Sequence, residues 1–323
     1  MTLRFGILGC ADIARRRVAP ALLALPGVEL VAVASRTPGR ASAFADEFGC
    51  APTTYTALLN RPDVDAVYLP LPPALHAEWT EAALLAGKHV LVEKPITPSA
   101  DTARALVWLA EERGLVLREN FMFPHHRQHH TVRDAMRAGL LGRVRSLSAE
   151  FGIPARPDGD IRYDAALAGG ALVDLGCYPL RLAQFLFGDG ITVRDAELYS
   201  TPAHGVDLIG RVTLSCPDSV TATIHFHLGG DYVNEYTVRG ESRSIRVERA
   251  FTPPADWTPR LTLTDGAGLV APAHDQVTAA LADFATACRD PHSDHSKRAA
   301  AIRTTELLDD IRAAAGWALT TVR

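Results

Sequence analysis

Stretches with the pattern of buried strands alternate with stretches of helical spacing along the first 120 residues, and this alternation restricts the fold more than any other feature. The strand-like runs are apolar with little alternation, at residues 3–9, 28–34, 66–71, 89–93 and 115–117. The helix-like segments lie at residues 12–25, 38–48, 56–60, 76–86 and 99–113. Pro20 predicts a kink or a restart within the first helix. The pattern predicts an α/β fold with a doubly wound parallel sheet.

The second half of the chain changes its period. From about residue 145, polar and apolar residues alternate strictly, as in 211–215, 221–227 and 245–248. A period of two with one polar face predicts antiparallel strands that are covered on one side only. Helical patterns accompany them, at residues 180–187, 274–289 and about 296–322. We therefore predict two domains: residues 1–120, and residues 121–323 as an α+β domain with an open, mostly antiparallel sheet.

The uncovered face of that sheet needs a ligand or another subunit against it, which predicts a homodimer or homotetramer formed through the C-terminal sheet. Composition excludes several other partners. With 33 Lys and Arg against 37 Asp and Glu, the net charge is −4, so we expect neither nucleic acid nor a membrane surface as a partner. No apolar run approaches the roughly 20 residues that span a bilayer.

The five cysteines are widely scattered and form no C-x-x-C pair. This spacing predicts neither a disulfide framework nor a zinc site, and it suits a reducing cytoplasm. The first residues, MTLRFGILGC, show no pattern of a secretory signal. We therefore expect a cytoplasmic protein.

A short glycine motif follows the first predicted strand. Residues 9–14 read G-C-A-D-I-A, which fits the pattern G-x-G-x-x-G/A with alanine in place of the second glycine. A tight turn here would aim the N–H groups of a helix N-terminus at a pyrophosphate. A plain strand-to-helix turn is the alternative, but the position within a run of βα units favours a dinucleotide site. The predicted contacts are Gly9, Cys10, Ala11, Asp12, Ile13 and Ala14.

The end of the second strand indicates which dinucleotide is bound. An NAD site usually has a carboxylate there, whereas this strand runs into Ser35-Arg36-Thr37 with Arg40 close by. A guanidinium and hydroxyls suit a 2′-phosphate, so the sequence predicts NADP(H), although Arg36 could also be an ordinary exposed arginine. The other cofactor contacts we expect near the carboxyl ends of the strands are Leu69, Pro70, Leu71, His76, Glu93, Lys94 and Pro95.

Two further motifs carry candidate catalytic groups. Lys94, directly after the strand-like run 89–93, could stabilise a developing alkoxide or donate a proton, although a lone lysine is more often a surface residue. Asp174 and Tyr178 are four residues apart, so a helix would place them on one face. An acid beside a phenol can relay a proton. Alone, such a pair is usually a capping aspartate and a half-buried tyrosine.

Together these motifs resemble the glucose–fructose oxidoreductase / inositol dehydrogenase / rhizopine catabolism (Gfo/Idh/MocA) family. The resemblance rests on the glycine turn, on E-K-P at 93–95 and on G-G-A-L-x-D-x-G-x-H/Y at 169–178, and it covers nearly the whole chain. It implies an N-terminal Rossmann domain, a C-terminal open-sheet domain and hydride transfer to or from a sugar or cyclitol carbon. Many members end the last motif with histidine; Tyr178 is typical of the NADP-dependent branch.

Within that branch, residues 119–129 and the glycine turn look most like the 3-ketoreductases of deoxysugar biosynthesis, which serve antibiotic pathways. This resemblance implies that NADPH reduces the C3 keto group of a nucleotide-linked keto-deoxyhexose, with dTDP as the expected nucleotide. Lys94 or Tyr178 would then protonate the oxygen, with Asp174 beside them. The alternatives are an NADP-dependent D-xylose or trans-dihydrodiol dehydrogenase, and a non-catalytic NADP-binding regulator.

The residues expected to contact the substrate lie between residues 120 and 236. Two arginines in the polar stretch before the glycine pair could grip a diphosphate or a sugar. The predicted contacts are Asn120, Phe121, Arg156, Arg162, Tyr178 and Tyr236. Four histidines, His125, His126, His129 and His130, have a spacing that zinc could use, but no carboxylate or thiolate completes the set, so we expect no metal.

Overall fold

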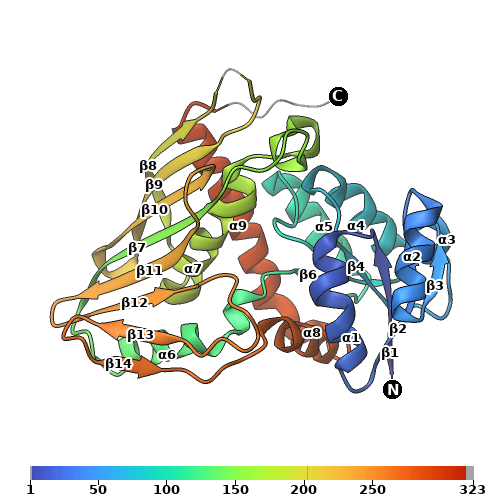
Figure 1. The fold of residues 1–323 in the computed structure, drawn as a ribbon, viewed down its shortest axis with the longest axis horizontal. Coiled ribbons are helices and arrows are strands. Elements are labelled where there is room, and N and C mark those ends of the chain that lie inside the picture. Colours follow the sequence, from blue (N-terminus) through green and yellow to red (C-terminus); the bar gives the residue numbers. More distant parts are fainter. Residues whose placement is uncertain (1, 202, 318–323) are drawn as a thin grey trace. The chain divides into compact units, whose positions relative to one another are not determined.

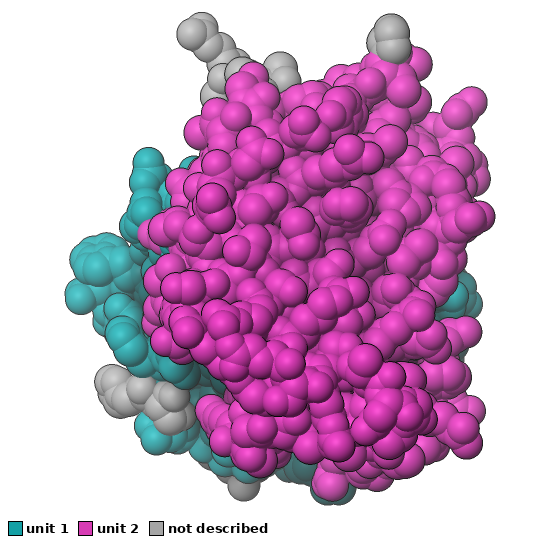
Figure 2. All heavy atoms as spheres, turned by 90° about the vertical axis from the view of Figure 1, so that its left-hand side faces the viewer, with its two compact units in different colours: residues 1–121, 277–305 teal, residues 122–276, 306–323 magenta. Residues whose placement is uncertain are grey.

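A computed structural model describes residues 2–201 and 203–317, and these form two compact units (Figure 1). The described residues up to 121 and those from 277 to 305 form unit 1, and the others form unit 2 (teal and magenta in Figure 2). The first break lies next to the predicted boundary at residue 120. The segment 277–305, which the sequence pattern assigned to the second domain, groups with unit 1 instead. The division into two functional domains stays a prediction.

Unit 1 contains a six-stranded parallel sheet with the strand order β3-β2-β1-β4-β5-β6. This is the order of a dinucleotide-binding doubly wound sheet, so the predicted fold class is confirmed. The strands are β1 (Leu3–Leu8), β2 (Val28–Ala34), β3 (Ala51–Thr53), β4 (Ala66–Leu69), β5 (His89–Val92) and β6 (Leu117–Glu119). The sequence pattern missed β3, because three residues that include Pro52 are too short to show a period.

The helices of unit 1 begin and end close to the predicted residues. They are α1 (Ala19–Ala24), α2 (Pro38–Phe48), α3 (Tyr55–Leu59), α4 (His76–Leu85), α5 (Ala100–Glu112), α8 (Gln276–Ala287) and the first part of α9 (His295–Ala314). A π-helical turn, Ala14–Val18, precedes α1, and Pro20 lies in the first turn of α1. The helix therefore restarts where the proline predicted it.

Helix α8 belongs to unit 1 because of its apolar stripe. Val277, Leu281 and Phe284 of this stripe are at most 4% exposed. The ring of Phe284 lies 5.7 Å from the ring of Phe5 in β1. The helical period revealed the buried face of α8, but it could not reveal the sheet against which that face packs.

Unit 2 is built on an eight-stranded sheet with the order β14-β13-β12-β11-β7-β10-β9-β8. Every neighbouring pair is antiparallel except β7 and β10, which pair in parallel with Thr221 opposite Ser146. The prediction of an open, mostly antiparallel sheet is confirmed. The strands are β7 (Val144–Ile153), β8 (Thr192–Tyr199), β9 (Ile209–Cys216), β10 (Val220–Leu228), β11 (Val233–Gly240), β12 (Ser244–Glu248), β13 (Arg260–Leu263) and β14 (Gly268–Val270).

One face of this sheet is apolar and covered, and the other is polar. Helix α7 (Cys177–Phe187) packs on β7 and β10, over buried residues such as Phe151 and Ile224. Figure 2 looks at unit 2 from the opposite side of the sheet. Side chains of that polar face, such as Arg211 and Thr223, are exposed.

Besides α7, the α-helices among the described residues of unit 2 are α6 (Arg127–Arg137) and the end of α9 at Ala314. The sequence pattern extended the last helix to residue 322, of which residues 318–322 lie outside the described part of the chain. No helix among the described residues has the length and apolar character needed to cross a bilayer.

Candidate active site

The glycine turn lies at the carboxyl end of β1, where a doubly wound sheet binds its ligand. Gly9 has φ +127°, and a Cβ on it would lie 2.9 Å from Cδ2 of Leu71, so the turn needs glycine here. Residues 10–13 follow, and the first helical bond runs from the Arg15 N–H to the Ala11 carbonyl at 3.1 Å. The first N–H groups of a helix have no partner within it. The turn therefore has the cradle that a pyrophosphate requires.

The other residues of the predicted turn occupy distinct positions. Ala14 is buried against the sheet, and Ile13 and Ala11 are half-buried. Asp12 is exposed and forms an ion pair with Arg16, one turn along the helix, at 2.5 Å. The carboxylate of Asp12 is therefore engaged with Arg16 at the surface. What this turn can offer an anion is its backbone.

Two arginines lie at the end of β2, beside the glycine turn. Arg40 Nη2 donates to the carbonyl of Cys10 at 3.0 Å, which ties the start of α2 to the turn. Arg36 is exposed, and Ser35 Oγ accepts from the Thr37 N–H at 3.2 Å. Positive charge and hydroxyls, with no carboxylate at residues 34–40, fit a 2′-phosphate better than a 2′-hydroxyl.

The turn that carries Lys94 is held by the residue before it. Glu93 Oε1 accepts from Tyr68 Oη at 2.7 Å and from Asn120 Nδ2 at 2.8 Å. Tyr68 is in β4 and Asn120 follows β6, so one carboxylate joins the ends of three neighbouring strands. Lys94 itself is half-buried. Glu93 therefore positions the lysine. Asn120 donates one amide N–H to Glu93, and its contact with substrate stays a prediction.

His76 joins two loops at the same end of the sheet. Its ring is fully buried, with Nδ1 2.8 Å from the carbonyl oxygen of Pro95 and Nε2 2.7 Å from that of Leu71. Burial, with a smaller contribution from the charge of Lys94, lowers the pKa of His76 to about 4. An uncharged ring has one N–H, so it donates to one of these carbonyls at a time. His76 thus contacts the loops of Leu71 and Pro95, which are themselves expected to contact the cofactor.

In unit 2, Asp174 and Tyr178 are the exceptions in a buried segment. Among residues 171–180 they alone are partly exposed, which indicates that they share one accessible face, as predicted. The local structure differs from the expected α-helix, because Leu172–Gly176 form a π-helical turn before α7 begins at Cys177. The ring of Tyr178 packs edge-on against Phe151, with centroids 5.1 Å apart.

Arg162 holds the carboxylate of Asp174. Its Nε donates to Asp174 Oδ2 at 2.6 Å, and its Nη1 donates to Asp160 Oδ1 at 3.1 Å. Asp160 also accepts from the backbone N–H of Arg162 at 3.0 Å. Both the Nε and the Nη1 groups of Arg162 thus already donate to carboxylates, which leaves fewer of its donors for a diphosphate. Arg162 is therefore better placed to orient Asp174 than to bind phosphate.

The other predicted substrate contacts fall in different environments. Arg156 is exposed, and its Nε lies 3.3 Å from Asp160 Oδ2. Phe121 is 4% exposed and Tyr236 is 1% exposed, so both lie in core positions, and their contact with a substrate stays a prediction. The hydroxyl of Tyr236 lies 3.1 Å from His129 Nδ1, and burial raises the pKa of that phenol.

The histidines near the start of α6 are packed into unit 2. His126 caps the helix, since its Nδ1 accepts from the Gln128 N–H at 3.2 Å. His129 Nε2 lies 2.9 Å from the carbonyl oxygen of Ala250. Burial lowers the pKa of His126 to about 4 and that of His129 to about 3, so both rings are neutral near pH 7. The described residues contain no group of three or more His, Cys, Asp or Glu side chains arranged to hold a metal.

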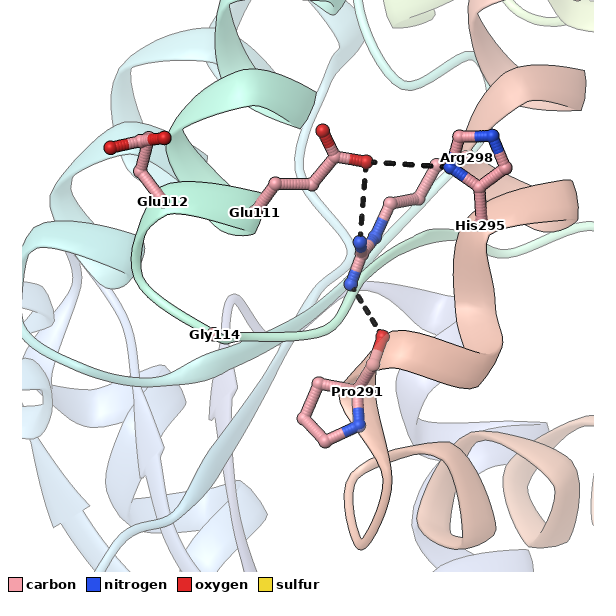
Figure 3. Close-up of a pocket in the computed structure, with 6 residues that line it drawn as sticks. All are labelled: Glu111, Glu112, Gly114, Pro291, His295 and Arg298. Carbon is pink, nitrogen blue, oxygen red and sulfur yellow. Dashed lines mark hydrogen bonds and ion pairs between the residues drawn. The ribbon is translucent and has the colours of Figure 1, made fainter.

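A separate pocket of about 410 Å³ opens on unit 1 (Figure 3). Glu111 Oε1 lies 3.4 Å from Arg298 Nη1 and 3.7 Å from His295 Nδ1, and Arg298 Nη2 donates to the carbonyl of Pro291 at 2.9 Å. None of the predicted site residues lines this pocket. It is therefore distinct from the Lys94 turn.

Sequence reasoning missed three groups that organise the site. Tyr68 anchors Glu93, Asp160 pairs with Arg162, and Asp207 accepts from the Leu172 N–H at 2.6 Å. Tyr68 and Asp207 act on residues that are far from them along the chain, and Asp160 acts partly on the backbone N–H of Arg162. The apolar periodicity of a single sequence carries no signal for such contacts. The one hint concerns Tyr68, which lies in β4. This strand pairs with β5, the strand that ends just before Glu93 and Lys94.

Comparisons with known proteins agree with this arrangement. The family model described as "Oxidoreductase family, NAD-binding Rossmann fold" (GFO_IDH_MocA) matches residues 3–121. The model described as "GFO/IDH/MocA C-terminal domain" matches residues 129–246. Together they cover both the glycine turn and the segment with Asp174 and Tyr178.

Curated relatives and solved structures match over almost the whole length. The chain is 50% identical over 327 residues to dTDP-3,4-didehydro-2,6-dideoxy-alpha-D-glucose 3-reductase of Streptomyces violaceoruber, covering 97% of this chain and 95% of the relative. It is 46% identical to the protein of the same name from Streptomyces antibioticus, covering 97% of each. KijD10, a 3-ketoreductase from Actinomadura kijaniata in complex with NADP and TDP-benzene, matches with a TM-score of 0.95 and 43% identity, covering 97% of this chain and 98% of that one.

Proposed function

The chain belongs to the Gfo/Idh/MocA oxidoreductase family, as its motifs predicted, and we propose that it reduces the C3 keto group of a dTDP-linked 3,4-didehydro-2,6-dideoxyhexose with NADPH. The observation that carries this proposal is the 50% identity over 97% of the chain to a reductase of that name. The sequence motifs predicted the same reaction. The alternatives with xylose or dihydrodiol substrates are outcomes of the test below.

The cofactor proposal rests on the turn after β1 and the end of β2. The backbone of residues 9–13 would hold the pyrophosphate, and Arg36 and Arg40 would face the 2′-phosphate. When bound, NADPH supplies the hydride that becomes the new hydrogen at C3. His76 and Glu93 keep the loops that carry Leu71 and Lys94 in place around this region. NADP(H) is thus the cofactor that the local charges favour.

The proton that completes the alcohol would come from Lys94 or Tyr178. We propose Lys94 as the indispensable group, because an ammonium both stabilises a developing alkoxide and donates a proton. Tyr178 is its partner or the direct donor. Asp174, held by Arg162, would share the accessible face of the segment with Tyr178.

The polar face of the unit 2 sheet supports the proposal of a homodimer or homotetramer. Its exposed side chains, such as Arg211, Thr223 and Arg246, can form hydrogen bonds and ion pairs with a second copy of the same face. Light scattering behind size exclusion tests it. A cytoplasmic location stays a proposal, based on the scattered spacing of the five cysteines.

The proposed activity can be tested with purified protein. The dTDP-linked 3,4-diketo sugar would be supplied as substrate, and NADPH consumption would be followed by the absorbance of NADPH. We expect consumption only when the dTDP-linked sugar and this protein are both present. Parallel reactions would offer NADP⁺ with D-xylose or a trans-dihydrodiol. Efficient oxidation of either, with no reduction of the dTDP sugar, would contradict the proposal in favour of the corresponding dehydrogenase.

A further inference from the structure

A buried carboxylate lies at the start of the helical segment that carries Asp174 and Tyr178. Asp207, just before β9, is 6% exposed. Its Oδ2 accepts from the Leu172 N–H at 2.6 Å, and its backbone carbonyl accepts from the Ala171 N–H at 2.8 Å. Two of the first N–H groups of the segment are therefore satisfied by one residue that lies 35 positions away in the chain.

The glycine pair before this segment is explained by the same contact. Gly170 has φ +118°, and a Cβ on it would lie 2.4 Å from Asp207 Oδ1. A Cβ on Gly169 would lie 2.5 Å from the carbonyl oxygen of Arg162, which accepts from the Gly170 N–H at 2.9 Å. Asp207 on one side and Arg162 on the other thus enclose the turn. Both residues touch the start of the segment, and Arg162 also touches Asp174.

Burial and the neighbouring groups act in opposite directions on the charge of Asp207. A carboxylate at a helix N-terminus interacts with unpaired N–H groups and with the positive end of the helix dipole. Burial raises the pKa of Asp207 to about 6, whereas the Leu172 N–H and the charge of Arg312 on α9 lower it. Arg312, which pairs with Asp309 at 3.1 Å, is the charged side chain acting on Asp207 from the packed helix.

We infer that Asp207 is a positioning residue for the reaction: by holding the Leu172 and Ala171 N–H groups, it fixes the start of the segment and thereby the placement of Asp174 and Tyr178. This inference rests on the proposed function. Asp207 acts through the backbone and has no direct chemical role. Loss of its carboxylate lets the first turn of the segment shift, and a shift of about 1 Å in a reacting group costs about a hundredfold in rate.

Three variants test the inference by steady-state kinetics. Asp207→Ala removes the side-chain acceptor, and we expect kcat to fall about 10- to 100-fold with the KM for NADPH unchanged, because the glycine turn and Arg36 belong to the other unit. Asp207→Asn keeps an oxygen that can accept from Leu172, so it should recover most of kcat. Asp265→Ala is the matched control: this exposed aspartate also accepts from a backbone N–H, that of Ala267 at 3.1 Å, and its loss should leave kcat unchanged.

A readout that does not depend on substrate separates this inference from the proposed function. Hydrogen exchange of the Leu172 amide, measured by NMR or mass spectrometry on the full chain, should be faster in Asp207→Ala than in the native protein and near native in Asp207→Asn, because only this amide bonds to the Asp207 side chain. Native kcat and native amide protection in Asp207→Ala would overturn the inference. If Asp207→Ala does not fold, an Asp207→Asn protein with unprotected Leu172 and native kcat would overturn it. A native protein with no activity on the dTDP sugar contradicts the function alone.

Discussion

Glu93 and Asn120 hold two strand ends together: the side-chain amide of Asn120 donates to Glu93 Oε1 at 2.8 Å, from just beyond β6 to just beyond β5. Tyr68 donates to the same oxygen from β4. Glu93, the residue next to Lys94, is thereby held from β4 on one side of β5 and from the end of β6 on the other. The accuracy with which Lys94 is placed depends on a carboxylate that does no chemistry itself.

Glu93→Ala should therefore damage catalysis while the sheet stays folded. We expect kcat to fall about 10- to 100-fold, since Lys94 loses its fixed position. Tyr68→Phe removes one of the two bonds and should have a smaller effect in the same direction. The measurement is kcat at saturating NADPH, with circular dichroism to verify folding. Native kcat in a folded Glu93→Ala protein would rule out this positioning role.

Lys94→Ala should separate catalysis from cofactor binding. The ammonium is expected to stabilise the alkoxide and supply a proton, so its removal should lower kcat by about 10²- to 10⁴-fold. The dissociation constant for NADPH, from fluorescence titration, should change only a few-fold, because the glycine turn and Arg36 remain.

Lys94→Arg keeps the charge with a different shape and serves as the control, with an intermediate kcat expected. A Lys94→Ala protein that is as active as the native one, or that still performs its cellular role, would instead indicate a non-catalytic NADP-binding regulator.

Arg36→Asp should reverse the preference between the two nicotinamide cofactors. A guanidinium bonded to a phosphate contributes about 1.5–3 kcal/mol, so NADPH should bind roughly 10- to 100-fold more weakly. NADH binding should change little or improve, since a carboxylate can accept from the ribose hydroxyl. Arg104→Asp, at an exposed arginine on α5, is the control. Equal affinity of the native protein for NADPH and NADH would refute the assignment.

The buried carboxyl of Asp207 predicts a pH-dependent stability. Its pKa is raised from 3.8 to about 6 in the folded protein, so folding favours the protonated form. The resulting stabilisation is fully present below about pH 4 and is lost as the pH rises through about 6, with a size on the order of 1–3 kcal/mol. Asp207→Asn should lack this loss. Urea unfolding at about pH 5 and about pH 7.5 measures it, and an identical pH dependence in both proteins would contradict it.

Much of unit 1 could be predicted because its signals are local. The strand Val28–Ala34 and the helix Pro38–Phe48 begin and end where the apolar pattern predicts, and Gly49 closes that helix with φ +69°. The pattern of unit 2 gave the covered and open faces of its strands. It could not give the parallel pairing of β7 with β10, because side chains alternate in the same way whichever direction a neighbour runs.

The candidate site was predictable in its motifs but not in its supports. Gly9, Lys94, Asp174 and Tyr178 follow from spacing and resemblance. The bonds of Glu93 to Tyr68 and Asn120 require the order β4-β5-β6 in space, which no local pattern contains. Tyr236 shows the opposite difficulty: an aromatic residue in an alternating strand has the same signature whether it faces a ligand or a buried histidine.

The most direct measurement of the proposed reaction uses NADPH that carries deuterium at the transferred position of the nicotinamide. The product of the dTDP-linked diketo sugar would be analysed by NMR to locate the label on the hexose ring. We predict deuterium bound to C3 in the native protein and negligible product from Lys94→Ala. Label at C4 or at any other carbon, or unlabelled sugar after NADPH has been consumed, would contradict a C3 reductase.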